Sequence, residues 1–165
     1  MTDLQVRDLL ASLREQRRHV LGAVAGLSDD ELRRPALPSG WNCLGLVNHL
    51  ALDVECFWFR AVLAGEPGAR ALLDASGDAW KVPDDEPSGA VLARYREQCA
   101  GADAVIARTA AGAAPAWWPD DRFGSWRLDT HRELLLHVIA ETACHAGHLD
   151  AALELLDGRQ WMVLH

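Results

Sequence analysis

Apolar residues recur at steps of three and four along most of the chain, which is the period of an amphipathic α-helix. In the first such segment the residues at this step are Leu10, Leu13, Val20, Leu21 and Val24. The same pattern predicts four long helices, over residues 4–25, 43–64, 88–111 and 131–157. No segment shows a sustained alternation of β-branched and polar residues, so we expect an all-α protein.

Capping signals support these helix starts. Asn42 stands before the second helix and is a good N-cap residue. Ser28 with Glu31, and Thr130 with Glu133, have the spacing of a capping box, in which the two residues satisfy each other's backbone N–H groups. The second of these pairs predicts the start of the fourth helix.

The link between the second and third helices, residues 65–87, is long and rich in Gly, Pro and Asp. A helix of about 22 residues is about 33 Å long. A link of this length can return along the whole helix, so the second and third helices can run parallel. Short links would instead force alternating directions.

The fourth helix carries polar residues on its apolar face. At about 100° per residue, His137, Glu141, His145 and His148 fall within about 80° of one another, in an arc that also holds leucines. The charged residues expected to face water lie elsewhere on the helix: Arg132, Asp150, Glu154 and Asp157. A buried carboxylate is costly unless it has a partner. A shared metal ion supplies one, and an internal hydrogen-bond network is the alternative.

The second helix repeats this feature. His49 stands in an apolar run and Asp53 follows one turn later. A lone histidine in such a run is more often a hydrogen-bonded core residue than a ligand, but the fourth helix shifts the balance toward metal binding. Cys56 and Cys144 lie near the same arcs and can also reach an ion, although buried cysteines are more often packing residues.

These motifs resemble a known family. Trp41, then His49-Leu50 and the segments 53–55 and 58–60, resemble the second helix of the DinB-like superfamily. The run 137–150, with its HxxxExxxHxxH register, and the end 154–158 resemble the fourth helix of its mini-circle branch. That branch is similar to the mycothiol-dependent maleylpyruvate isomerase N-terminal domain. The resemblance covers nearly the whole chain as one domain, residues 1–165.

The resemblance implies a four-helix bundle in up-down-down-up order with a divalent metal at its mouth. Carried over by position, the ligands are His49, Glu141 and His145. Many members have histidine in place of Glu141, and the arginine common before the last ligand is Cys144 here. Asp53, His137 and His148 are candidates for alternative ligands or for hydrogen bonds that orient the ligands.

Two histidines and one carboxylate leave a coordination position open, as in catalytic zinc sites. Zinc is the expected ion, and nickel or iron(II) also suits this set. The resemblance implies mycothiol as a cosubstrate, so we expect a metal-dependent thiol S-transferase acting on a small electrophile. A metal-dependent hydrolase and a non-catalytic, stress-related metal-binding bundle are the alternatives.

The loop over residues 112–129 is rich in aromatic residues. We expect Trp117, Trp118 and Trp126 to line a pocket beside the metal, although such residues can also simply plug a bundle end. Apolar residues on several faces of the second helix are consistent with a homodimer or with tight packing inside one chain: Val54, Trp58, Phe59 and Val62.

The composition and charge of the chain limit which classes of partner and which cellular locations are expected. The chain of 165 residues has 16 basic and 24 acidic residues, and the net charge of −8 disfavours nucleic acid as a partner. No apolar run reaches the roughly 18 residues of a membrane span, and no secretory signal is visible. The four cysteines form no CxxC pair, so we expect no disulfide framework and a cytoplasmic protein.

Overall fold

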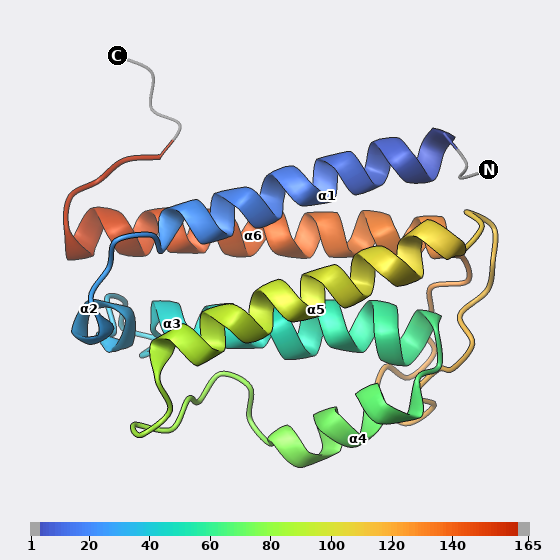
Figure 1. The fold of residues 1–165 in the computed structure, drawn as a ribbon, viewed down its shortest axis with the longest axis horizontal. Coiled ribbons are helices and arrows are strands. Elements are labelled where there is room, and N and C mark those ends of the chain that lie inside the picture. The colour runs from blue at the N-terminus through green and yellow to red at the C-terminus, as the bar shows by residue number, and fades with distance from the viewer. Residues whose placement is uncertain (1–3, 162–165) are drawn as a thin grey trace.

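Every regular element in the described residues, 4–161, is helical in this computed structural model (Figure 1). The elements in chain order are α1 (Leu4–Ala23), α2 (Asp29–Arg33), α3 (Cys43–His49), η1 (Leu50–Leu63), α4 (Pro67–Ser76), α5 (Ser88–Arg108) and α6 (His131–Leu156). Because α3 leads directly into η1, the two form one continuous helix. The prediction of an all-α protein is confirmed for this part of the chain.

The long helices form two pairs. In Figure 1, α1 and α6 run from right to left, whereas α3–η1 and α5 run from left to right. The most extensive packing is between α1 and α6 and between η1 and α5. The capping predictions locate the helix starts well: Asn42 Oδ1 accepts from the Gly45 N–H at 2.8 Å, and Thr130 Oγ1 accepts from the Glu133 N–H at 3.2 Å.

The long link contains a helix that the sequence analysis missed. Pro67 begins α4, and Gly77 follows its end with φ +65°. Proline at the first helical position and glycine just past the last are the residues that suit those backbone conformations. The Gly, Pro and Asp content of the link therefore marks the ends of α4 and the turns after it.

Helix η1 has the i→i+5 hydrogen bonds of a π-helix and is 14 residues long, whereas most π-helical segments are single turns. At its end the Ala64 N–H donates to the Phe59 carbonyl at 3.0 Å. The loop before α6 then covers this end, because the N–H groups of Ala116 and Trp117 donate to Leu63 and Val62, each at 3.1 Å. The loop is thereby fixed over the end of η1.

A buried ion pair joins three helices. Two nitrogens of Arg17 in α1 donate to the two carboxylate oxygens of Glu55 in η1, each at 2.6 Å. A third donates to Asp103 in α5, also at 2.6 Å. Arg17 and Glu55 are buried, so each charge depends on the other for its stabilisation.

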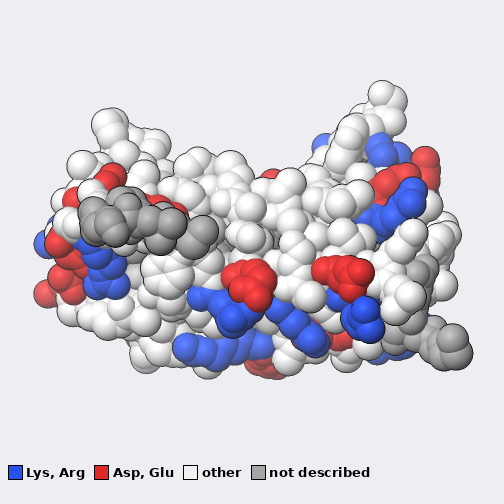
Figure 2. Space-filling model, turned by 90° about the horizontal axis from the view of Figure 1, so that it is seen from above, with Lys and Arg blue, Asp and Glu red and all other residues white. Residues whose placement is uncertain are grey.

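Three features of the structure concern the expected partners: the surface charges, the burial of apolar residues in η1, and the length and polarity of the helices. Figure 2 shows Lys and Arg side chains next to Asp and Glu side chains on the face drawn. Val54, Trp58, Phe59 and Val62 are buried within the single chain, so internal packing accounts for the pattern that had suggested a homodimer. No helix within residues 4–161 is long and apolar enough to cross a bilayer.

Candidate metal centre

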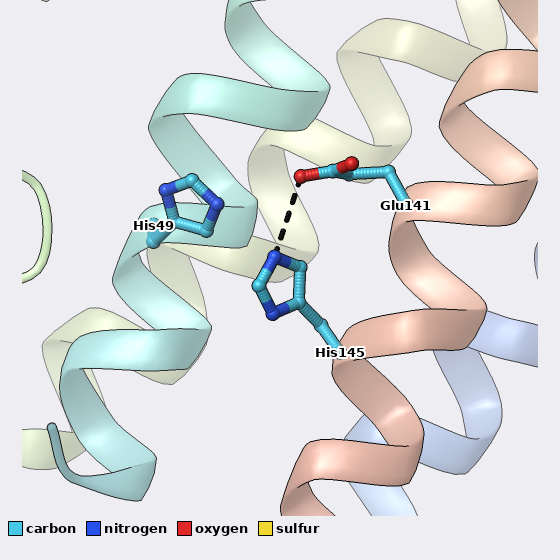
Figure 3. Close-up of side chains that lie close together, drawn as sticks. All are labelled: His49, Glu141 and His145. Carbon is cyan, nitrogen blue, oxygen red and sulfur yellow. Dashed lines mark ion pairs between the residues drawn. The ribbon is translucent and has the colours of Figure 1, made fainter. Parts of the chain in front are cut away.

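Three side chains from two helices converge at one point (Figure 3). His49 comes from the end of α3, and Glu141 and His145 come from α6. One possible ligand atom from each residue lies within 4.8 Å of those of the other two. His145 Nε2 is 3.3 Å from the Glu141 carboxylate. These are the three residues that the sequence analysis predicted as ligands.

The chemistry of the cluster fits a cation. His49 Nδ1 lies 2.9 Å from the Asp53 carboxylate and donates to it, which leaves Nε2 as an acceptor. That Nε2 is buried and has no hydrogen-bond partner among the described residues. Metal–ligand bonds of about 2.0–2.2 Å in tetrahedral geometry place ligand atoms about 3.4 Å apart. Small side-chain rotations are therefore enough to close the cluster around a divalent ion.

His145 is held in the neutral form that binds metals. Burial lowers its pKa, and the neighbouring His49 lowers it further, while the Glu141 carboxylate opposes both effects. His148 Nδ1 lies 3.3 Å from His145 Nδ1, on the opposite edge of the ring from the nitrogen that faces Glu141. His148 thus contacts His145 on the side away from Glu141 and lies outside the three-residue cluster.

The polar residues of α6 lie at the edge of its buried face, whereas the sequence analysis placed them among its leucines. On the same helical wheel the buried residues centre at about 120° from His137. They include Leu135, Val138, Thr142, Leu149 and Leu153. Leu155, which the wheel places at the same angle as His137 and so within the arc predicted to be buried, is 64% exposed. The arc is displaced because α6 packs mainly against α1, and the cluster consequently borders solvent.

A cleft of about 390 Å³ opens beside the cluster. Its lining residues are His49, Asp53, Val54, Phe57, Trp58, Arg122, Phe123, Trp126, His137 and Glu141. His137 lies edge-on to Trp58 with ring centroids 4.8 Å apart, and burial lowers its pKa. The His137 ring is therefore part of an aromatic wall and lies outside the cluster of His49, Glu141 and His145.

The three loop tryptophans occupy different positions. Trp126 lines the cleft. Trp118 is buried behind it, with ring centroids 6.0 Å from Trp126 and 5.9 Å from Trp58. Trp117 instead lines a neighbouring cavity of about 380 Å³, where the Arg70 guanidinium lies over its ring.

Trp58, which the sequence pattern had assigned to packing inside one chain or between two chains, also forms part of the cleft wall. In an α-helix, positions 49 and 58 lie about 180° apart, on opposite faces. In η1 each turn contains more residues, so steps of four and five stay on one face. Positions 49, 53, 54, 57 and 58 all line the same cleft as a result.

Trp80, from the link before α5, is a site residue that the sequence analysis missed. Its ring stacks on His49, with centroids 4.3 Å apart and planes at 19°. The link approaches so closely that a Cβ on Gly45 would lie 2.3 Å from the Trp80 carbonyl oxygen. The Asn48 side chain also donates to the Ala79 carbonyl at 2.8 Å. A glycine inside an apolar helical run was the one available signal of this approach.

The sequence matches the Mycothiol-S-transferase family over residues 8–158, which is all but seven residues at either end. The chain belongs to the mycothiol S-transferase family. This family lies within the DinB-like superfamily, so the resemblance to that superfamily is confirmed. The mycothiol S-transferase match includes the three cluster residues and Trp80. No curated protein and no solved structure matches the chain.

Proposed function

We propose that this protein transfers the thiol of mycothiol to a small electrophile at a divalent metal held by His49, Glu141 and His145. The observation that carries the proposal is the buried, unpartnered His49 Nε2 beside Glu141 and His145 in a member of this family. When bound, a divalent cation supplies positive charge that favours the thiolate form of the cosubstrate.

The chain's own residues supply orientation and a dry surface. Asp53 holds the His49 ring in one tautomer, and Trp80 fixes its plane by stacking. His137 is neutral near pH 7 because burial lowers its pKa, so its ring can accept the proton that the thiol loses. The aromatic wall formed by Phe57, Trp58 and Trp126 suits an apolar electrophile.

Several finer assignments are part of the same proposal. We take the chain as a single domain, and the directions of the long helices support an up-down-down-up four-helix bundle. Zinc is the proposed ion because two histidines and a carboxylate with an open position form a catalytic zinc set, and nickel or iron(II) also accepts these ligands. The maleylpyruvate isomerase-like branch and a cytoplasmic location are likewise proposed.

An assay of purified protein tests the function. Elemental analysis should find about one divalent ion per chain. With mycothiol and a model electrophile such as a halobimane, mass spectrometry should detect the thioether conjugate, and a chelator should abolish its formation. Loss of the electrophile in the absence of thiol would instead indicate a hydrolase. Stoichiometric metal without any turnover would indicate a metal-binding protein, and both results would overturn the proposal.

A further inference from the structure

A second, polar cleft adjoins the ligand cluster at Trp80. It measures about 510 Å³, and its lining residues are Gly40, Trp41, Asn42, Trp80, Lys81, Val82, Pro83 and Asp84. A neighbouring hollow of about 430 Å³ shares four of these residues and adds Ser39 and Asp78. We call the two together the tryptophan groove, formed by residues 39–42 and 78–84.

Both tryptophans of the groove contact histidines at the cluster. The Trp80 ring centroid lies 4.3 Å from that of His49 and 5.6 Å from that of His145. The Trp41 centroid lies 6.2 Å from that of His148, which in turn contacts His145 at 3.3 Å. A ligand in the tryptophan groove is therefore adjacent to the residues proposed to hold the metal.

The two clefts beside the cluster differ in chemistry. The cleft at Trp58 and Trp126 sets four Phe and Trp rings beside the charged groups of Asp53, Arg122 and Glu141. The tryptophan groove has two indoles and surrounds them with a hydroxyl, an amide, an amine and carboxylates. Within residues 4–161, Asp84 forms none of the ion pairs, so its carboxylate can accept hydrogen bonds from a ligand. Flat indole faces that pack on C–H groups, with polar groups at their edges for hydroxyls, suit sugars and cyclitols.

The geometry points to separate sites for the two substrates. The tryptophan groove binds the glucosaminyl-inositol part of mycothiol, and the aromatic cleft binds the electrophile. The sulfur of mycothiol then approaches His49, Glu141 and His145 from the Trp80 side. The electrophile approaches the sulfur from the Trp126 side. This inference rests on the proposed function, because it assigns the parts of that reaction's substrates.

Binding of glucosaminyl-inositol, which has no thiol, tests the groove without any turnover. Calorimetry on metal-free protein should detect binding to the wild type. Trp41→Ala should weaken it about five- to tenfold, as expected for the loss of one stacking contact. Asp84→Asn, an exposed substitution that spares the packing, should also weaken it. Trp126→Ala and the matched control Trp161→Ala, which lies outside both clefts, should bind like wild type.

Two results would overturn the assignment. One is wild-type affinity in both Trp41→Ala and Asp84→Asn, with circular dichroism showing that both are folded. The other is loss of glucosaminyl-inositol binding in Trp126→Ala, which would place the sugar in the aromatic cleft.

Kinetics separates this inference from the proposed function. The ratio of kcat/KM for mycothiol to kcat/KM for N-acetylcysteine, which has no sugar, measures what the groove contributes. Trp41→Ala should lower this ratio about five- to tenfold, and Trp126→Ala should leave it unchanged while raising KM for the electrophile. If Trp41→Ala still transfers the thiol and its ratio of the two kcat/KM values is unchanged, the groove assignment is wrong while the proposed function stands. If neither thiol reacts, the proposed function fails. Calorimetry then still tests whether glucosaminyl-inositol binds in the tryptophan groove.

Discussion

The Nδ1 nitrogen of His49 lies 2.9 Å from the carboxylate of Asp53, one turn further along the same helix. Because Nδ1 carries the hydrogen that this bond requires, Nε2 is left as the acceptor beside Glu141 and His145. Asp53 is therefore placed to orient the His49 ring, and its carboxylate lies outside the three-residue cluster. Carboxylates that hold a histidine ring in this way are a common feature of metal sites.

Replacing Asp53 by asparagine should weaken metal binding while all three ligands remain. We expect the affinity to fall about 10- to 100-fold, the usual effect of losing such an orienting partner. Competition with a chromophoric chelator measures the change. Asp8→Asn, an exposed aspartate on α1, is the control and should bind as the wild type does. Equal metal affinities for Asp53→Asn and wild type would show that Asp53 does not orient the His49 ring for metal binding.

Replacing His49 by alanine should abolish metal retention and thiol-dependent activity, because α6 alone then contributes two ligands. The helical content measured by circular dichroism should stay near that of the wild type, since the imidazole's partners are the site residues themselves. Elemental analysis after dialysis gives the decisive number. A variant that still held one ion per chain would shift the assignment to the α6 histidines with Cys144.

Alanine at position 45 should disturb both stability and the site. The new Cβ would lie 2.3 Å from the Trp80 carbonyl oxygen, so the link must move away and take the Trp80 ring off His49. Overpacking of this kind costs about 1–3 kcal/mol of the free energy of unfolding. Urea unfolding measures the loss, and chelator competition should show weaker metal binding.

Gly147→Ala is the matched control for this substitution. Gly147 lies inside α6 with nothing within 4 Å of the added Cβ. Alanine is the better helix former, so this change should raise the free energy of unfolding by about 0.5–1 kcal/mol. If both variants were equally stable, the close approach of the link at Gly45 would be refuted.

Arg17→Met should destabilise the fold strongly. The substitution leaves the Glu55 carboxylate buried without its guanidinium partner, and breaking a buried pair in this way costs about 3–5 kcal/mol. Arg18→Met is the control, because the Arg18–Glu15 pair is exposed, and such pairs contribute about 0–1 kcal/mol. Urea unfolding measures the free energy of unfolding of both variants. Similar losses in the two would mean that the buried pair contributes no more to stability than the exposed pair.

Polar residues on the apolar helix faces were predictable because their signal is local, whereas the choice of three of them as ligands came from the family resemblance. His49, Glu141 and His145 interrupt apolar helical patterns, and the cost of burying polar groups makes such an interruption meaningful from sequence alone. The helix starts at Asn42 and Thr130 were predictable for the same reason, since a cap acts within three residues. Helical periodicity likewise determined the all-α class.

The surroundings of the cluster depend on contacts between distant segments. Trp80 reaches His49 through the approach of the link to Gly45, and no spacing rule connects these positions. Trp58 shares a cleft with His49 because η1 is wound as a π-helix, whereas the wheel used for prediction assumes an α-helix. The exposure of Leu155 follows from the side on which α1 packs, which a single helix does not reveal.

His131 should make stability depend on pH. Burial lowers its pKa below the ordinary value of 6.5, and the contacts with the carbonyls of Ala110 and Thr109 oppose this only in part. In the unfolded chain the imidazole titrates near its ordinary value, so just below that pH the unfolded state binds more protons. The stabilisation is therefore fully present above about pH 6.5 and is lost as the pH falls toward the folded-state pKa.

Urea unfolding of metal-free protein between about pH 7.5 and 5 should show a flatter pH dependence in His131→Gln than in wild type. His137 and His145, whose pKa values are also lowered, remain in both proteins, so the difference between the curves isolates His131. Parallel curves would show that the burial of His131 leaves its protonation unchanged on folding.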